Sequence, residues 1–352
     1  MHKIYKALLI ILFGLTYMSA TAQTNTNGLR LLNPGYIIGP KGDTIYNVSP
    51  GVWSFQNDTL KNVVIQGIET ISSLNNTYFV SSTFPNTGKY YSTIQRAIDS
   101  ISGTNDTTYK TIVVLPGKYS GFTCSKSYVN IIGLGNPIIT DVNYSFVNLT
   151  GTNILFKGFK IFRKNHLIEN SYFRAINLTG SKISISDVDI DLSLFQNIYS
   201  ITPTFSLIRA SSGVDSLTII NCNLVASKLD EYESVVSTNY GISIENAACK
   251  FYTRNVNIKL EFYNGNVDPV GTTMNVYGIY FNTTDGTKYK RIINSTNIYI
   301  NVDSDFYTIN TYSVKDVSGS SSNTLIKDCI FNTDLGLTAT YVALIIDPDF
   351  VY

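Results

Sequence analysis

The sequence predicts an all-β protein built as a solenoid, in which similar turns of chain stack on one another. Three observations predict it: a β-like composition, a bend-centred pattern that recurs along the chain, and a lack of helical periodicity between the copies. The chain has 352 residues, including 25 Tyr and 18 Phe, and its charged residues, 14% of the total, balance to +1. This composition favours strands and argues against electrostatic binding to nucleic acid or to an anionic membrane.

The recurring pattern alternates apolar and variable residues on both sides of a bend. Six copies begin at residues 154, 183, 217, 251, 291 and 324, so that successive copies start 29 to 40 residues apart, and a truncated copy begins at 129. The fifth position is always Gly, Asp, Asn or Ser, which tolerate bends. Positions 1, 3, 6 and 8 then lie on one side of the chain, and stacking the copies in register would bury them as inner columns.

Other β architectures fit this spacing poorly. A sandwich of hairpins predicts strands every 8–12 residues. Parallel strands joined by helices would show 3.6-residue periodicity between copies, and none is found after residue 101. A coil of β rungs remains, so we expect a parallel β-helix.

One amphipathic helix is predicted ahead of the coil, over residues 92–102. Its apolar residues recur at helical spacing, Ser92 and Gln95 form a capping box, and Gly103 supplies a stop. The helix would plug the first end of the coil, whose edges would otherwise template aggregation. The apolar segment 339–346 would cover or extend the other end.

The first residues resemble an export signal. Lys3 and Lys6 precede an apolar run over 7–15, and residues 20–22 form a small-x-small cleavage site. We therefore predict a signal peptide at 1–22, a β-rich section at 23–87 and the coil at 88–352. No segment is apolar enough to predict a membrane span, so the mature protein is expected to be secreted, extracellular or on the cell surface.

Cysteine and histidine usage predicts neither disulfides nor zinc. The four cysteines show no close pairing, and Cys222 and Cys329 fall at inward position 6, as small buried hydrophobes would. Only His2 and His166 are present, and His166 is expected in a loop.

The predicted helix and first rungs resemble pectin-lyase-like β-helices. The segments 91–99, 111–119 and 129–135 are similar to the capping helix, the strand with Pro-Gly and the first coil of pectinesterases. The resemblance implies a right-handed parallel β-helix and does not imply an activity, because the superfamily includes lyases, hydrolases, esterases, tailspikes and inactive adhesins. The catalytic motifs of pectinesterases and polygalacturonases do not carry over to this sequence.

An acidic cluster is the best candidate for catalysis. Asp187 is a bend residue, and Asp189 and Asp191 follow on outward positions. Carboxylates about 7 Å apart could hold Ca²⁺ or act as acid and base on a polysaccharide. A lyase also needs a nearby base, for which Arg254 is one candidate. The alternative is a solvated strand face. The other candidate bases are Lys157, Lys160 and Arg209.

Outward position 7 forms a polar column that suits glycan binding. Its members, with the neighbouring Tyr252, are Lys160, Asp189, Asn223, Asn257 and Asn297. Amides and tyrosines suit sugar hydroxyls and sugar faces, and they equally suit solubility and rung pairing.

Outward position 2 is apolar at four rungs, which indicates cover by a loop or another subunit. A homotrimer is one hypothesis for that cover. The four residues are Leu155, Tyr252, Ile292 and Leu325.

Two classes of function follow from these residues. The first is a secreted, non-catalytic β-helix that binds a polysaccharide or cell-surface glycan, as an adhesin or a tailspike-like surface or virion module. The second is a polysaccharide lyase or glycoside hydrolase acting on an acidic polysaccharide through Asp187, Asp189 and Asp191. A purely structural role is a third hypothesis and predicts neither binding nor turnover.

Overall fold

The chain divides into two compact units, residues 1–74 and 75–352. The computed structural model describes residues 30–32, 36–38, 44–49, 52–55, 76–140, 145–168, 172–197, 204–230, 236–246, 248–264, 273–282, 290–302, 308–317 and 323–335. The predicted signal peptide and the segment 339–346 lie outside the described residues. None of the helices described is long and apolar enough to cross a membrane.

The first unit contains a four-stranded antiparallel sheet in the order β1-β2-β3-β4. Its strands are β1 (Arg30–Leu32), β2 (Tyr36–Ile38), β3 (Thr44–Ser49) and β4 (Val52–Phe55). Small strands joined by tight turns were expected in this part of the chain.

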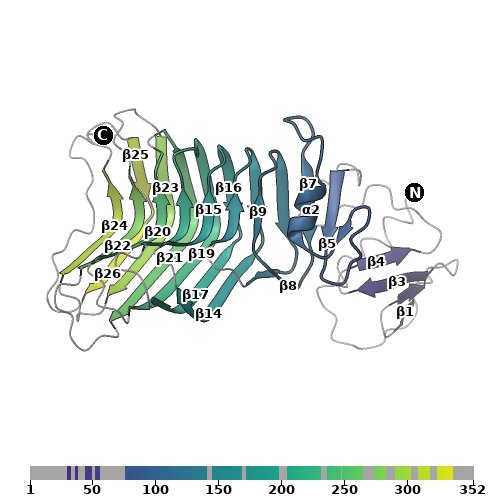
Figure 1. Ribbon diagram of the computed structural model, residues 1–352, viewed down its shortest axis with the longest axis horizontal. Coiled ribbons are helices and arrows are strands. Elements are labelled where there is room, and N and C mark those ends of the chain that lie inside the picture. The colour runs from purple at the N-terminus through teal and green to yellow at the C-terminus, as the bar shows by residue number, and fades with distance from the viewer. Residues whose placement is uncertain are drawn as a thin grey trace. The chain divides into compact units, whose positions relative to one another are not determined.

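The second unit is a coil in which each complete rung has three strands (Figure 1). The first strands are β7 (Lys110–Val114), β10 (Val129–Gly133), β13 (Ile154–Lys157), β16 (Lys182–Ser186), β25 (Asn323–Lys327) and the first parts of β19 (Ser216–Asp230), β21 (Lys250–Asn264) and β23 (Lys290–Val302). The second strands are β8 (Lys118–Tyr119), β11 (Ile138–Ile139), β14 (Lys160–Ile168), β17 (Asp189–Asn197), β26 (Ile330–Leu335) and the second parts of β19, β21 and β23. The third strands are β9 (Phe122–Cys124), β12 (Ser145–Leu149), β15 (Tyr172–Leu178), β18 (Thr204–Ala210), β20 (Val236–Ile244), β22 (Thr273–Phe281) and β24 (Thr308–Asp316).

Each strand of a rung pairs in parallel with its counterpart one rung away. Ile154 pairs with Ile183, and Ile183 pairs with Leu217, so equivalent positions of the repeat stand side by side. Because paired strands belong to successive rungs and are separated in the sequence by a full turn of chain, the chain winds as a coil rather than folding into hairpins. The predicted right-handed parallel β-helix is confirmed as the fold.

The bend at the fifth position of the repeat is left-handed. Asp187, Asn221 and Asn255 each have a φ of 53°, and Ser295 has a φ of 46°. Residues with a Cβ avoid this region, and Asn, Asp and Gly tolerate it best. The restricted choice of residues at this position therefore has a backbone cause.

The inner columns form one continuous apolar core. Positions 1, 3, 6 and 8 of the clearest copies are buried as predicted, and the third strands add stacked rings such as Phe173 and Phe205, whose centroids lie 5.6 Å apart. Cys222 is 3% exposed, and burial raises the pKa of its thiol to about 12. Cys329 is half-buried, and all four cysteines are free thiols.

The helix α2 (Ile94–Ser100) is shorter than predicted and has a different cap. Thr93 is the N-cap residue, and its hydroxyl accepts a hydrogen bond from the Arg96 amide. Ser92 binds Asn86 instead, and Gln95 exchanges hydrogen bonds with the backbone of Thr123. The predicted capping box is therefore absent, because the coil offers Gln95 a better partner.

The helix buries its predicted apolar face against the first end of the coil. Ile94, Ala97 and Ile98 are at most 1% exposed. The helix contacts β9, β7, β5 (Thr77–Val80) and β6 (Tyr90–Tyr91).

Two further assignments differ from the sequence analysis. Strand β5 pairs with β7, so residues 77–80 belong to the coil and not to an amino-terminal section ending at 87. His166 lies in strand β14 rather than in a loop, because the second strand of that rung continues beyond the eight-residue pattern.

One inner position carries a charge. Arg291 occupies position 1 of its rung, is 2% exposed, and forms an ion pair with Asp316. Its guanidinium lies 4.3 Å from the centroid of the Phe281 ring, and Thr324 donates a hydrogen bond to Asp316 over 3.4 Å. A buried cation is tolerated here because a carboxylate and an aromatic face surround it.

Replacing Asn221 by Val should lower the free energy of unfolding by more than about 1–2 kcal/mol, since Val resists a positive φ and cannot join its neighbours' hydrogen bonds. Asn221→Gly keeps the backbone conformation and should cost clearly less. Urea unfolding of both variants measures the difference, and equal losses would contradict a backbone origin.

Arg291→Ala should cost about 3–5 kcal/mol of stability because it leaves the Asp316 carboxylate without its buried partner. The double variant Arg291→Met with Asp316→Leu should recover most of the loss, because it removes both charges. A double variant no more stable than Arg291→Ala in urea titrations would argue against this explanation.

Candidate functional site

Two rows of polar side chains flank the left-handed bends. We call the row at the fifth position the bend ladder; it contains Asp187, Asn221 and Asn255. We call the row at position 7 the outer ladder; it contains Lys160, Asp189, Asn223, Asn257 and Asn297, and its register is continuous. The structure therefore brings the predicted polar column together as one surface row.

Both ladders begin with a lysine–aspartate pair. The Lys157 Nζ lies 3.5 Å from the Asp187 carboxylate, and the Lys160 Nζ lies 3.6 Å from that of Asp189. Both side chains of each pair are more than one-third exposed, so solvent screening keeps the contribution of the ion pair to stability small. Each pair nevertheless occupies a carboxylate that was a candidate for catalysis.

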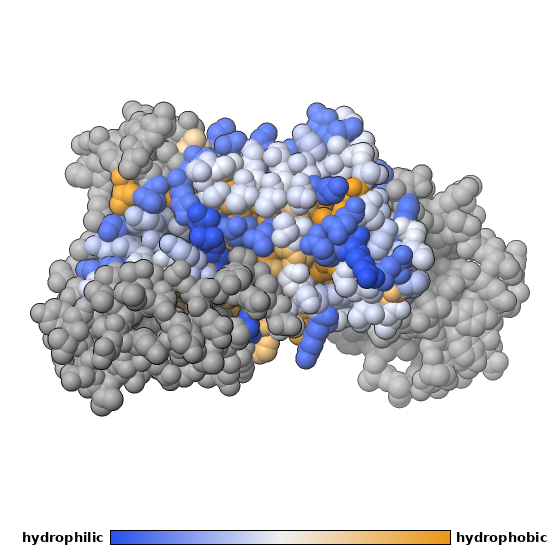
Figure 2. All heavy atoms as spheres, viewed as in Figure 1, coloured by the Kyte–Doolittle hydropathy of each residue, from blue (hydrophilic) through white to orange (hydrophobic). Residues whose placement is uncertain are grey.

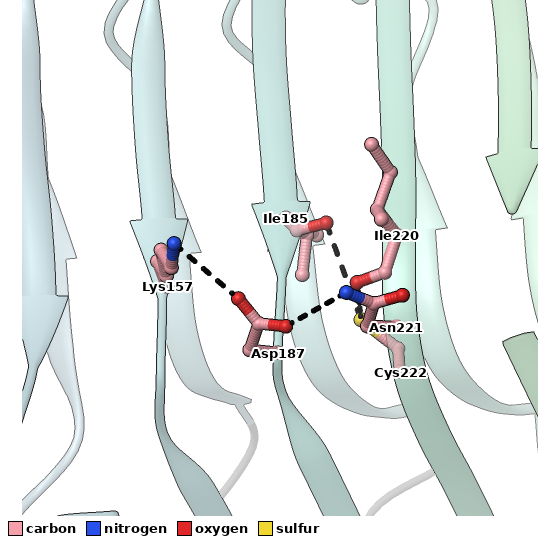
Figure 3. A network of polar contacts seen from close by, with 6 residues as sticks. All are labelled: Lys157, Ile185, Asp187, Ile220, Asn221 and Cys222. Carbon is pink, nitrogen blue, oxygen red and sulfur yellow. Dashed lines mark hydrogen bonds and ion pairs between the residues drawn. The ribbon is translucent and has the colours of Figure 1, made fainter. Parts of the chain in front are cut away.

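The next rungs add amides that bond to one another. Asn221 donates to the Asp187 carboxylate over 3.0 Å, as Figure 3 shows, and Asn255 donates to Asn221 over 3.2 Å. In the outer ladder Asn223 donates to Asp189 over 2.9 Å, and Asn257 donates to Asn223 over 2.7 Å. These amides hold adjacent rungs in register, which favours the rung-pairing interpretation for this part of the row.

The other predicted catalytic residues do not join the aspartate pair. Asp191 lies two residues beyond Asp189 on β17, in register between Phe162 and Val225, and forms no ion pair with a described residue. Ser186 pairs with Ile220, and Ile220 pairs with Arg254. Arg254 is therefore two rungs from the Asp187 rung, roughly 10 Å along the coil. No three acidic, histidine or cysteine side chains among the described residues gather into a set that could hold a metal ion.

Tyr252 and the apolar column lie on the first strands, on the other side of the bends from the outer ladder. Tyr252 stands between Thr218 and Ile292, and both Tyr252 and Ile292 are half-buried. Leu325 at the end of this column is 51% exposed. Tyr252 is therefore not part of the outer ladder, although the sequence analysis groups it with the amides of that row.

The third strands form a second polar surface that the sequence analysis missed. On these strands two consecutive residues are buried, such as Ala175–Ile176 and Gly241–Ile242, so outward side chains recur three residues apart. Gly278 must be small because a Cβ there would approach the Ile298 side chain to 2.5 Å. Figure 2 shows that the described surface on one face is mostly hydrophilic or intermediate, with smaller hydrophobic areas.

Four tyrosines gather on the third strands of the later rungs. Tyr240, Tyr277 and Tyr312 stand in register, with ring centroids 5.2 and 5.4 Å apart in near-parallel stacks. Tyr280 packs against the stack at 4.8 Å from Tyr277, and the Lys315 ammonium lies 4.2 Å from the Tyr312 ring centroid. Tyr277 is buried and the other three tyrosines are half-buried, so these side chains form a packed aromatic cluster next to a cation.

Two arginines continue the same columns on the earlier rungs. Arg209 forms a bidentate pair with Glu245 at 2.6 and 2.5 Å and donates to Asn177 over 3.2 Å. Arg174 is half-buried and lies on a column that leads through Ser206 to Tyr240. No carboxylate of the described residues lies within ion-pair distance of Arg174, and burial and the nearby Arg209 lower its pKa. The Arg174 guanidinium lies 5.6 Å from the centroid of the Tyr172 ring, so among the described residues its direct partner is an aromatic ring rather than an anion.

A second repeat in the sequence signals this surface. Tyr-Gly-Ile, Tyr-Gly-Ile and Tyr-Ser-Val recur at 240–242, 277–279 and 312–314. The bend-centred pattern covers only the first and second strands of each rung, so it leaves these residues out. Insertions of variable length separate the copies, so the repeat becomes evident only when the third strands are aligned by their register.

Stability should fall at alkaline pH because of the tyrosine stack. Burial and neighbouring tyrosines raise the pKa of Tyr277 to about 12 and raise that of Tyr240 further, against 10.0 for a free tyrosine. A raised folded-state pKa gives stability that is intact below pH 10 and is lost as the pH rises towards the folded pKa. Urea midpoints at about pH 9 and about pH 11 should differ less in Tyr277→Phe than in the wild type; an equal difference would contradict this origin.

Comparisons with known proteins find similarity in structure and none in sequence. No protein-family model and no curated protein sequence matches the chain. A pectin methylesterase in complex with a hexasaccharide is 12% identical, with 70% of this chain and 92% of that one covered and a TM-score of 0.36. The pectin methylesterase of Aspergillus niger is 11% identical, with 78% and 93% covered and a TM-score of 0.35.

A viral protein, ORF18 of Geobacillus virus E2, is 13% identical, with 84% of this chain and 68% of that one covered and a TM-score of 0.28. At such identities no residue role passes from one protein to another. The fold assignment rests on the strand register of this chain. The register confirms the parallel β-helix that the sequence resemblance implied.

Proposed function

We propose that this protein is a secreted, non-catalytic β-helix that binds an anionic glycan on its third-strand surface, as an adhesin or tailspike-like module would. The observation that carries the proposal is Arg174, a half-buried cation that has no carboxylate of the described residues at ion-pair distance and lies beside the Arg209–Glu245 pair. A carboxylate or sulfate on a sugar would supply the missing anion through charge-assisted hydrogen bonds.

The rest of the surface suits an extended sugar chain. The columns run from the arginines to the tyrosines along the coil axis, with equivalent residues repeating about every 4.8 Å. Ser206, Ser243 and Tyr277 within them are buried, so a ligand would contact the half-buried arginines and the other tyrosines. Tyrosine offers an apolar ring edge and a hydroxyl at small entropic cost, and Lys315 places a second cation at the far end. A polymer with repeated negative charges can contact both ends.

Catalysis by the aspartates finds less support in the geometry. Asp187 and Asp189 are each engaged by a lysine and an asparagine, while Asp191 and Arg254 lie apart from them. A polysaccharide lyase or glycoside hydrolase therefore remains the second hypothesis, and turnover assays separate it from binding.

Binding should be lost on removing the Arg174 charge. Arg174→Gln should weaken binding to immobilised polygalacturonate or heparin at least tenfold, about 1.4 kcal/mol, while neutral dextran should not bind at this surface. Arg254→Gln, which removes an exposed arginine on the first strands, is the matched control and should bind like the wild type. Equal weakening in both variants would show that binding depends on the net charge of the protein rather than on the third-strand surface, and would contradict the proposal.

Turnover is measured on the same polysaccharides through reducing ends and the absorbance of unsaturated products. We expect none for the wild type. Cleavage that disappears in Asp189→Asn would overturn the non-catalytic proposal.

A further inference from the structure

We propose that the carboxyl-terminal end of the two ladders is a binding site for a neutral sugar, separate from the Arg174 surface. Both ladders are interrupted between the rung of Asn255 and the rung of Ser295. Asn255 and Asn257 are the last amides to donate to the preceding rung. On the next rung the bend residue is Ser295, whose hydroxyl donates to its neighbour Asn294, and the side chain of Asn297 forms no hydrogen bond to another described residue.

The interruption leaves complementary polar groups on both sides. The side-chain oxygens of Asn255 and Asn257 accept no hydrogen bond from the following rung, and the amide of Asn297 retains two donors and an acceptor. The three asparagines are exposed, so these groups are accessible to a ligand. Elsewhere in the ladders the same groups are occupied by one another.

A hollow coincides with this interruption. Its volume is about 310 Å³, and it is lined by Asn255, Val256, Asn257, Ser295, Asn297 and Asp328. Pockets for small ligands begin at about 300 Å³, which suits one or two sugar rings. The residue that follows Asn297 in the outer ladder column is Ile330, which is 66% exposed and can contact the apolar face of a ring.

The donor set favours a sugar over a cation or an anion. Adjacent sugar hydroxyls donate and accept, as the asparagine amides do. Asp328 is the single carboxylate in the lining, and Lys327 lies 3.9 Å from it. Calcium requires six to eight oxygen ligands, usually with several carboxylates, and an anionic sugar would meet the Asp328 charge.

The test uses the side-chain amide resonances of the ¹⁵N-labelled full chain, titrated with maltose, cellobiose, lactose and mannobiose. We expect saturable shifts of the Asn257 and Asn297 amides with at least one disaccharide. Asn297→Ala should abolish the shift at Asn257, and the melting temperature of this variant should stay close to that of the wild type because the Asn297 side chain forms no hydrogen bond to another described residue. No saturable shift with any of the four sugars overturns the proposal, as does a shift with calcium chloride alone.

A second variant closes the site without deleting any group. Ser295→Asn places an amide at a φ of 46°, which asparagine accepts, where it can donate to Asn255 and extend the bend ladder. This variant should bind the sugar at least tenfold more weakly and melt no lower than the wild type. Undiminished binding would show that the interruption is not the site. Asn310→Ala, which removes an amide–amide hydrogen bond to Asn275 on the third strands, is the matched control and should keep binding.

The two sites can fail independently. Arg174→Gln should leave the disaccharide shifts unchanged, and Ser295→Asn should leave polygalacturonate binding unchanged. Loss of both ligands in either variant would indicate a change in the coil and would contradict two separate sites.

Discussion

The left-handed bend at the fifth position of each rung is the constraint on which the rest of the coil depends. It joins two strands that alternate inward and outward, and it sets positions 1, 3, 6 and 8 inward in every clear copy. A residue with an ordinary Cβ at this φ costs roughly 1–2 kcal/mol, and the cost recurs on each rung. Asp187, Asn221 and Asn255 avoid most of it, and because rungs stack in register, their side chains meet as a ladder.

Register stacking turns a position in the repeat into a column on the molecule, and columns differ in what their polar groups do. In the ladders the groups bond to one another, which holds rungs together and leaves little for a ligand until the row is interrupted. On the third strands Arg209 is paired with Glu245, whereas Arg174 has no carboxylate of the described residues at ion-pair distance. Surfaces where polar groups remain uncompensated are therefore better candidates for binding than surfaces that are merely polar.

This distinction also bears on the enzyme hypothesis. A pair of carboxylates two residues apart on a strand has the spacing of a catalytic pair, and the sequence alone makes Asp187 and Asp189 plausible for that role. In the structure each carboxylate already holds a lysine and an amide, so the pair has a complete structural explanation. The fold of a family known for enzymes does not by itself supply the chemistry.

The sequence by itself determined the rung, its bend and its inner columns, because strand alternation and left-handed bends restrict residue types locally. It also determined the helix face of Ile94, Ala97 and Ile98, though not its cap, since Gln95 is drawn to the backbone of Thr123 across the coil. The position-7 column could also be predicted, whereas the contacts among outward residues of the third strands became evident only in the tertiary structure. Tyr240, Tyr277 and Tyr312 are 35 to 37 residues apart, and insertions of varying length between them hide a register that backbone pairing between rungs makes exact.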